Sequence, residues 1–186
     1  MNIDKVLLEQ AYHSIYEDNN PFKPAAADDI VGRKQQHLRL ANQKVRDYIK
    51  AGSVGDLDLY NTLIQSLPDN LQVGGNLRLS NTPIKSLPAD LKVGGHLWLT
   101  GTEIQSLPDN LKVGGYLSLT STSIKSLPDN LQVGGNLDLY STPIQSLPAD
   151  LKVGGDLGLF NTPLTNKYTK EQIREMCPGI KGKVYV

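Results

Sequence analysis

Residues 61–80 read NTLIQSLPDNLQVGGNLRLS and residues 81–100 read NTPIKSLPADLKVGGHLWLT, and this pair of similar blocks decides the fold. A unit of twenty residues recurs over residues 52–166, with full copies beginning at residues 61, 81, 101, 121 and 141. The copies share the frame xTxIxSLPxxLxVGGxLxLx, whereas a partial copy, GSVGDLDLY, precedes them and another, NTPL, follows. Self-similarity at a fixed period of this length indicates a stacked-repeat architecture in which each unit forms one coil.

The L-x-L tripeptide after each glycine pair predicts a short strand, because its side chains alternate between two faces. The first leucine of each tripeptide then points inward and forms a ladder of Leu57, Leu77, Leu97, Leu117, Leu137 and Leu157. The rest of each coil is expected to bring apolar side chains against this ladder, as Ile64, Leu67, Leu71 and Val73 do in one unit. Six such strands would stack at about 4.8 Å into one parallel sheet.

Two further columns of the repeat are predicted to be structural. Gly74 and Gly75, with their copies, are expected at a sharp turn where glycine reaches positive φ without penalty. A dinucleotide-binding glycine loop would need a helix directly after the turn, and here a strand follows. A threonine occupies one position of every unit, and its hydroxyl is expected to bond the backbone of the neighbouring coil. These threonines are Thr62, Thr82, Thr102, Thr122, Thr142 and Thr162.

The pattern L-x-L-x-x-T-x-I at a period of twenty residues resembles a leucine-rich repeat, with Thr where many members carry Asn. The SLP segment is similar to the short bacterial type, found in secreted effectors and in phage-encoded or bacterial proteins. This resemblance implies an α/β-type repeat solenoid with a parallel concave β-sheet and a mostly extended or irregular convex side. It also implies that the concave sheet binds another macromolecule, usually a protein.

Both ends of the array are expected to be covered, because a stack otherwise exposes open strand edges and its leucine core. Residues 1–51 are predicted to form a helical N-terminal cap, residues 52–166 the repeat array, and residues 167–186 a short C-terminal cap. Apolar residues at helical spacing predict two N-terminal helices, one on Val6, Leu7, Ala11 and Ile15, and one on Leu38, Ala41, Val45, Tyr48 and Ile49.

Local signals place the ends of two helices and a last strand. Asp28 or Asp29 is the expected N-cap of the second N-terminal helix. Near the C-terminus, Thr169 and Gln172 predict a capping box for a short helix that ends before Pro178. Residues 183–186 are expected to add a final strand.

Composition narrows the functional classes. Nineteen Lys and Arg balance nineteen Asp and Glu, so charge provides no case for a nucleic-acid or membrane-surface binder. The single cysteine, Cys177, forms no internal disulfide, and no Cys and His cluster has zinc-ligand spacing. The N-terminal sequence lacks a signal-peptide apolar segment, and no window is apolar enough to span a bilayer. We expect a cytoplasmic protein, of the producing or a host cell, without cofactor or metal.

The outward-facing strand positions vary between units while the frame stays fixed, and they hold all five aromatic residues of the repeats. An aromatic side chain left in water forgoes roughly a few kcal/mol of burial, which favours a functional reason for its exposure. Trp, Tyr and Arg also dominate binding hot spots. The residues predicted to bind a partner are Trp98, Tyr116, His96, Arg78, Tyr140, Asp138, Tyr60, Asp58 and Phe160.

We expect a non-enzymatic module that binds a partner protein and is monomeric until it does so. Paired carboxylates such as Asp56 with Asp58, and His96 as a base, are not expected to catalyse because a sheet face lacks a deep pocket. Exposed aromatics also favour strand surfaces through cross-strand packing, so a structural role for them stays open. The alternative function is an assembly protein that self-associates or scaffolds a larger complex. Nucleic acid is disfavoured, since the outward columns carry one Arg and four Asp.

Overall fold

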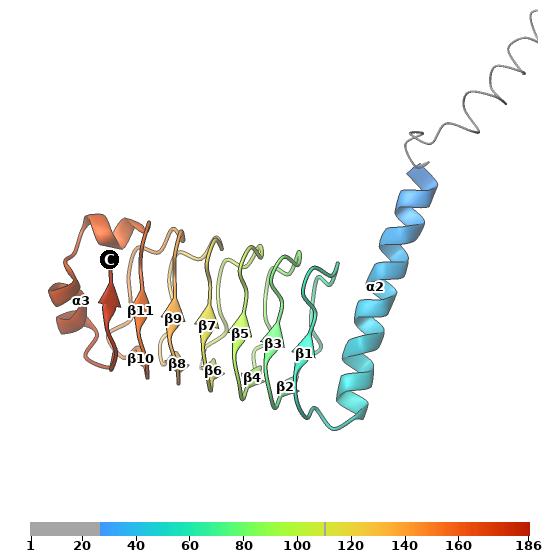
Figure 1. Ribbon diagram of the computed structural model, residues 1–186, viewed down its shortest axis with the longest axis horizontal. Coiled ribbons are helices and arrows are strands. Elements are labelled where there is room, and N and C mark those ends of the chain that lie inside the picture. The colour runs from blue at the N-terminus through green and yellow to red at the C-terminus, as the bar shows by residue number, and fades with distance from the viewer. Residues whose placement is uncertain (1–26, 110) are drawn as a thin grey trace, which may run out of the picture. The chain divides into compact units, whose positions relative to one another are not determined.

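The computed structural model describes residues 27–109 and 111–186, and the chain divides into two units, Met1–Gln36 and His37–Val186. The second unit is a parallel β-solenoid whose strands recur about every twenty residues, as the repeat predicts (Figure 1). Helix α2 (Ala27–Lys50) precedes the first coil in the sequence and crosses the boundary between the units. The helix predicted on Val6, Leu7, Ala11 and Ile15 lies outside the described residues.

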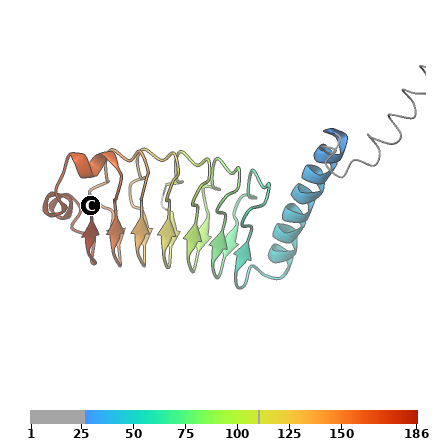
Figure 2. The same ribbon diagram turned by 45° about the horizontal axis from the view of Figure 1, so that its top comes forward.

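One sheet has seven strands in the order β1-β3-β5-β7-β9-β11-β12, which follow one another side by side in Figure 2. Its strands are β1 (Leu57–Asp58), β3 (Leu77–Arg78), β5 (Leu97–Trp98), β7 (Leu117–Ser118), β9 (Leu137–Asp138), β11 (Leu157–Gly158) and β12 (Val184–Tyr185). Each leucine pairs with the leucine of the next coil, as Leu57 does with Leu77, except that Leu157 pairs with Val184. The backbone follows the same register, since the Leu57 amide donates to the Asn76 carbonyl at 2.7 Å.

A second parallel sheet of five strands runs in the order β10-β8-β6-β4-β2. Its strands are β2 (Gln72–Val73), β4 (Lys92–Val93), β6 (Lys112–Val113), β8 (Gln132–Val133) and β10 (Lys152–Val153). The sequence predicts this stretch as an extended return path, and the structure adds regular pairing between coils. The physical reason is the constant period, which places every extended segment beside its own copy one coil away.

The core lies between the two sheets and the extended segment that connects them. The ladder leucines, the L-x-L leucines that follow them and the isoleucines such as Ile64 are at most 1% exposed. Complete burial of such a side chain stabilises the fold by about 1.5–3 kcal/mol relative to exposure. The predicted core is therefore confirmed, and it is shared between coils, because each leucine packs against its copies in the coils on either side.

The glycine pairs serve close packing between coils, and the predicted positive φ is wrong. Positive φ is found at Gly52, Gly55 and Gly101 among the described glycines, and not at the paired ones. A Cβ atom on Gly114 or Gly134 would instead collide with the carbonyl oxygen of the equivalent glycine one coil earlier. Glycine is required here because the backbones of successive coils approach closely.

The left-handed backbone lies at the first position of each unit. Asn61, Asn81, Gly101, Ser121, Ser141 and Asn161 all have φ between 55° and 68°. Asparagine and glycine are the residues that accept this conformation most readily, and their presence in one column is the sequence signal that predicts it. The chain therefore turns directly after each L-x-L strand.

Five of the six threonine hydroxyls bond within their own coil, and the buried Thr162 Oγ1 has no hydrogen-bond partner among the described residues, so the predicted bridge to the neighbouring coil is wrong. Thr82 Oγ1 donates to the Leu79 carbonyl at 2.7 Å, and Thr62, Thr102, Thr122 and Thr142 repeat this bond at 2.7–2.8 Å. The left-handed residue before each threonine folds the chain back, which brings this carbonyl within reach. The hydroxyls therefore hold the turn that ends each strand.

Helix α2 packs against the array through the part that belongs to the second unit. Ala41, Val45 and Tyr48 are buried in the common core, as predicted, whereas Ile49 is 43% exposed. The Tyr48 hydroxyl donates toward the Ser53 and Gly55 carbonyls, at 2.8 and 3.0 Å, which ties the helix to the first coil. Asp28 and Asp29 lie inside the helix, which includes Ala27, so the predicted N-cap is wrong.

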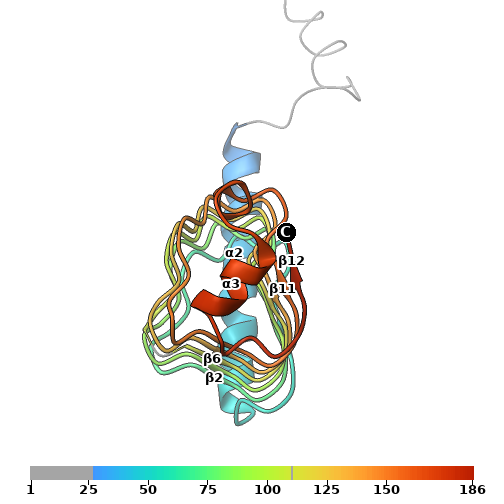
Figure 3. The same cartoon turned by 90° about the vertical axis from the view of Figure 1, so that its left-hand side faces the viewer.

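The C-terminal residues follow their local signals. The 3₁₀ helix η2 (Pro163–Asn166) leads to helix α3 (Lys170–Met176), whose capping box at Thr169 and Gln172 is confirmed. Figure 3 looks along the stack from this end, where α3 lies across the last coil. Strand β12 pairs with β11 in parallel, which confirms the predicted final strand.

Candidate functional site

The three outward columns of the seven-stranded sheet form one surface, which we call the outward face. Its residues are Asp56, Asp58, Tyr60, Asn76, Arg78, Ser80, His96, Trp98, Thr100, Tyr116, Ser118, Thr120, Asn136, Asp138, Tyr140, Asp156, Gly158 and Phe160. They alternate along each strand with the buried leucines, because successive side chains of a strand point to opposite faces. All nine residues predicted to bind a partner lie on this face.

The first column is a ladder of hydrogen-bond acceptors that sequence reasoning missed. The Asn76 and His96 backbone amides donate to the Asp56 and Asn76 side-chain oxygens, both at 2.8 Å. The Tyr116 amide donates to His96 Nδ1 at 2.7 Å, which places the proton of the neutral ring on Nε2. Asn136 and Asp156 accept in the same way from the next coil, at 2.8 and 2.7 Å. The signal was the preference for Asp, Asn and His in this column.

The ladder has an electrostatic consequence at its first member. The Asn76 backbone amide, and then the Asn76 side chain, hold the pKa of the Asp56 carboxyl below its ordinary value. Hydrogen bonds to a carboxylate favour its charged form. Tyr116 interrupts the ladder, because its hydroxyl is directed toward Asp138.

The centre of the face is a cluster of Arg78, His96, Trp98 and Tyr116. The Arg78 guanidinium carbon lies 4.8 Å from the centre of the Trp98 ring, a cation–π arrangement. His96 meets Trp98 edge-on at 5.3 Å between ring centres, and Tyr116 meets Trp98 in the same manner at 6.4 Å. The contacts of Trp98 with Arg78 and Tyr116 join neighbouring coils, and the contact with His96 lies within one coil. Together they hold the three rings in fixed orientations. Trp98 and Tyr116 are half-buried, and His96 and Arg78 are exposed.

Asp138 connects this cluster to the next coils. Its Oδ2 accepts from the Tyr116 hydroxyl at 3.0 Å, and its Oδ1 accepts from the Tyr140 backbone amide at 3.0 Å. Burial, and after it the charge and hydrogen bond of Asp138, raise the pKa of the Tyr116 hydroxyl. Tyr116 therefore stays protonated and acts as a donor. Asp58 occupies the equivalent position in the first coil, where it accepts from the Tyr60 amide at 3.0 Å and lies 4.0 Å from Arg78.

The last part of the face is an aromatic pair, Tyr140 and Phe160, beside a glycine, Gly158. Tyr140 and Phe160 meet edge-on at 5.3 Å between ring centres. The Tyr140 ring lies where a side chain of Gly158 would extend, which explains why this coil carries glycine in its central position. Phe160 remains 46% exposed.

Tyr60 lies on the other side of the cluster and is 56% exposed. Together with Arg78, Ser80 and Trp98 it lines an open hollow of about 310 Å³. The predicted residues thus form one series of neighbours from Asp58 and Tyr60 to Phe160. Ser118 lies in an outward column but is covered by its neighbours, because it is 3% exposed and bonded to Thr100 Oγ1 at 2.9 Å.

The face offers side-chain groups for recognition, and its chemistry follows from their types. Rings of Tyr60, Trp98 and Phe160 present apolar area, and Arg78 presents a charged donor beside them. Within residues 27–109 and 111–186, no group of three or more His, Cys, Asp or Glu side chains is placed to hold a metal ion. Over the same residues, no helix is long and apolar enough to cross a membrane.

Comparison with family models, with curated proteins and with solved structures finds no match for this chain.

Proposed function

We propose that this chain is a leucine-rich-repeat recognition module that binds a partner protein through the outward face, the concave face in such repeats. The observation that carries the proposal is the Arg78, His96, Trp98 and Tyr116 cluster at the centre of the face. Arg, Trp and Tyr dominate the binding energy of protein interfaces, typically from the centre of the contact. Here they are held by contacts within and between coils before any partner arrives.

Preorganisation supports binding because ordered side chains lose less entropy when the partner docks. Tyr116 is bonded to Asp138 and packed against Trp98, so its ring has a defined position. Six coils with three outward residues each offer about 800 Å² per partner, the area of a standard protein interface. An exposed aromatic patch of this extent is typical of an interaction surface.

The difference between the nearly constant core positions and the variable outward positions also favours recognition over catalysis. The core positions repeat with little change, whereas the outward positions differ from coil to coil. The variation on this face includes ring, charged and amide side chains, and such variety is suited to specificity for one partner. The outward face provides no enclosed pocket for chemistry, and its hollow at Trp98 is open. We infer a cytoplasmic, effector-like protein without cofactor, on the basis of the repeat type and the single buried cysteine.

The test is affinity purification from cells of the source, followed by mass spectrometry, with Trp98→Ala and Tyr116→Ala as variants. We expect each variant to weaken partner binding at least about 30-fold, the loss typical of a hot-spot residue. Lys125→Ala is the matched control, because Lys125 is exposed and lies outside both sheets. Normal binding by both aromatic variants, with unchanged circular dichroism, would show that the face is not the binding surface.

Self-assembly is separated from partner binding by sedimentation of the purified chain. A monomer at tens of micromolar supports the recognition module. Concentration-dependent association that Trp98→Ala abolishes would instead support the assembly protein.

A further inference from the structure

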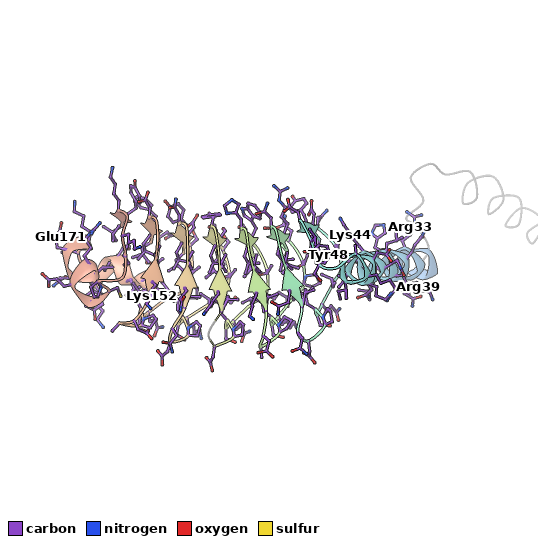
Figure 4. The ribbon with its side chains drawn as sticks, turned by 90° about the horizontal axis from the view of Figure 1, so that it is seen from below. Arg33, Arg39, Lys44, Tyr48, Lys152 and Glu171 are labelled. Atoms are coloured by element: carbon purple, nitrogen blue, oxygen red, sulfur yellow. The ribbon has the colours of Figure 1, made fainter. Side chains whose placement is uncertain are left out.

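A groove of about 570 Å³ runs along the corner where the second sheet turns toward the first. It crosses the last coils of the second unit and lies away from the outward face. Its lining residues are Lys112, Val113, Gly114, Gln132, Val133, Gly134, Lys152, Val153, Gly154, Gly179 and Lys181. Figure 4 views this side of the array from below, with Lys152 labelled.

The floor of the groove is backbone, because glycine is required at this corner and the Val113, Val133 and Val153 side chains are buried in the core. Side chains at Gly114, Gly134 and Gly154 would collide with the carbonyl of the preceding coil, so none rises from the floor. The amides of these glycines already donate to valine carbonyls of the preceding coil, at 2.8–2.9 Å. A bound molecule can therefore approach the backbone of the floor closely, but these glycine amides are not free to donate hydrogen bonds to it.

The wall of the groove is cationic. Lys112, Lys152 and Lys181 are exposed, and the groove is lined by no carboxylate. The ion pairs found among the described residues join Arg78 to Asp58, Lys85 to Glu103 and Lys170 to Glu171, and none involves these three lysines. Three ammonium groups thus line one groove without an internal counter-ion.

We propose that this groove binds an extended acidic peptide, whose carboxylates pair with Lys112, Lys152 and Lys181 while its backbone lies over the glycines. Successive coils are about 4.8 Å apart, so three intervals span about 14 Å, the length of four or five extended residues. Nucleic acid is less suited, because three lysines spread over this length match the spaced carboxylates of a short peptide better than a strand that carries a phosphate about every 3.4 Å. This site is separate from the outward face and does not depend on the proposed function.

The chain contains its own controls for a test of the lysines. The position of Lys112 and Lys152 is occupied by glutamine in two other coils, at Gln72 and Gln132, and all four belong to the same sheet. Lys→Gln at these sites therefore removes charge without introducing a residue foreign to the position. Gln132→Lys completes the row and adds charge in the middle of the groove.

The experiment measures fluorescence anisotropy of a labelled octapeptide of alternating Glu and Ala with the full chain at low salt. Alternation places all carboxylates on one side of an extended strand. We expect the double variant Lys112→Gln, Lys152→Gln to bind about tenfold more weakly, from the loss of two ion pairs. Gln132→Lys is expected to bind more tightly. A peptide of alternating Lys and Ala is expected not to bind.

The control is the double variant Lys85→Gln, Lys125→Gln, which removes equal charge at a position where other coils also carry glutamine. Its binding is expected to equal that of the wild type. An equal loss in this control, or no binding by the wild type, would overturn the proposal.

Two further results would show that the groove binds something other than an acidic peptide. Stronger displacement by a single-stranded oligonucleotide than by unlabelled peptide would show that the groove binds nucleic acid. Self-association that depends on Lys112 and Lys152 would show that it binds a second copy. Circular dichroism of every variant confirms that the fold is retained.

Discussion

At the residue scale, single side chains of the outward face also serve the fold. His96 is the clearest case, because its Nδ1 accepts the Tyr116 amide while its ring contacts Trp98. In other coils the same acceptor is an asparagine or aspartate oxygen, as at Asn76. An imidazole at this position therefore combines a structural bond with an aromatic surface.

Replacement of His96 separates these two roles. His96→Ala removes the acceptor of the Tyr116 amide, and we expect a loss of about 1 kcal/mol in the free energy of unfolding. His96→Asn restores an acceptor that Asn76 and Asn136 already provide, and its stability is expected to lie within about 0.5 kcal/mol of the wild type. Urea unfolding of both variants measures the difference. Equal destabilisation would mean that ring packing, rather than the hydrogen bond, accounts for the effect.

At the element scale, the distance between neighbouring coils determines which residues each coil can carry. The glycine column marks where two backbones approach too closely for a Cβ atom, and Gly134 lies against the Gly114 carbonyl. Helix α2 also contains a glycine, Gly32, but apart from its chain neighbours and the adjacent helix backbone no described atom lies within 4 Å of the position that its Cβ would take. The same substitution thus has opposite consequences in the two elements.

Gly134→Ala is expected to destabilise the array by about 1–3 kcal/mol, because the added methyl group forces the coils apart. Gly32→Ala is expected to cause no loss, since alanine favours the helix by about 0.5–1 kcal/mol relative to glycine. Thermal unfolding followed by circular dichroism compares the two variants. A midpoint for Gly134→Ala equal to that of the wild type would contradict the close approach of the coils.

The core residues of each coil were predictable from sequence, whereas several of the hydrogen bonds of each coil were not. Leu57 and Ile64 were placed in the core by alternation and period alone. The hydroxyl bond of Thr82 within its own coil depends on the left-handed turn at Asn81, which the sequence analysis did not identify. The second sheet was missed because alternation over so short a segment is too weak to predict a strand.

At the scale of the whole molecule, the second unit is stabilised by contacts between adjacent coils, and its ends determine how it opens. Tyr48 joins helix α2 to the start of the array, with its hydroxyl bonded to Ser53 and Gly55 and accepting the Gly74 amide at 3.2 Å. In a stack where each coil contacts only its neighbours, the loss of a contact at one end destabilises the adjacent coil more than the distant ones. The loss of the Tyr48 hydrogen bonds should therefore destabilise the first coils and leave the last coils unchanged.

Tyr48→Phe removes the hydroxyl while keeping the ring in the core. We expect faster amide hydrogen exchange in strands β1 and β3, with little change in β9 and β11, because the coil next to the lost bonds opens first. Tyr168→Phe, at the opposite end of the array, is the control. A uniform increase over all strands would show that the array unfolds as a single cooperative unit.

The sequence by itself determined the coils, the leucine core and the set of outward residues, because a fixed period decides which side chains share a face. Tertiary structure alone decided what those outward residues contact. The acceptor ladder from Asp56 to Asp156, the bond from Tyr116 to Asp138 and the groove beside Lys152 all join different coils. Their existence depends on the short distance between successive coils, and that distance is set by the packing of the whole stack.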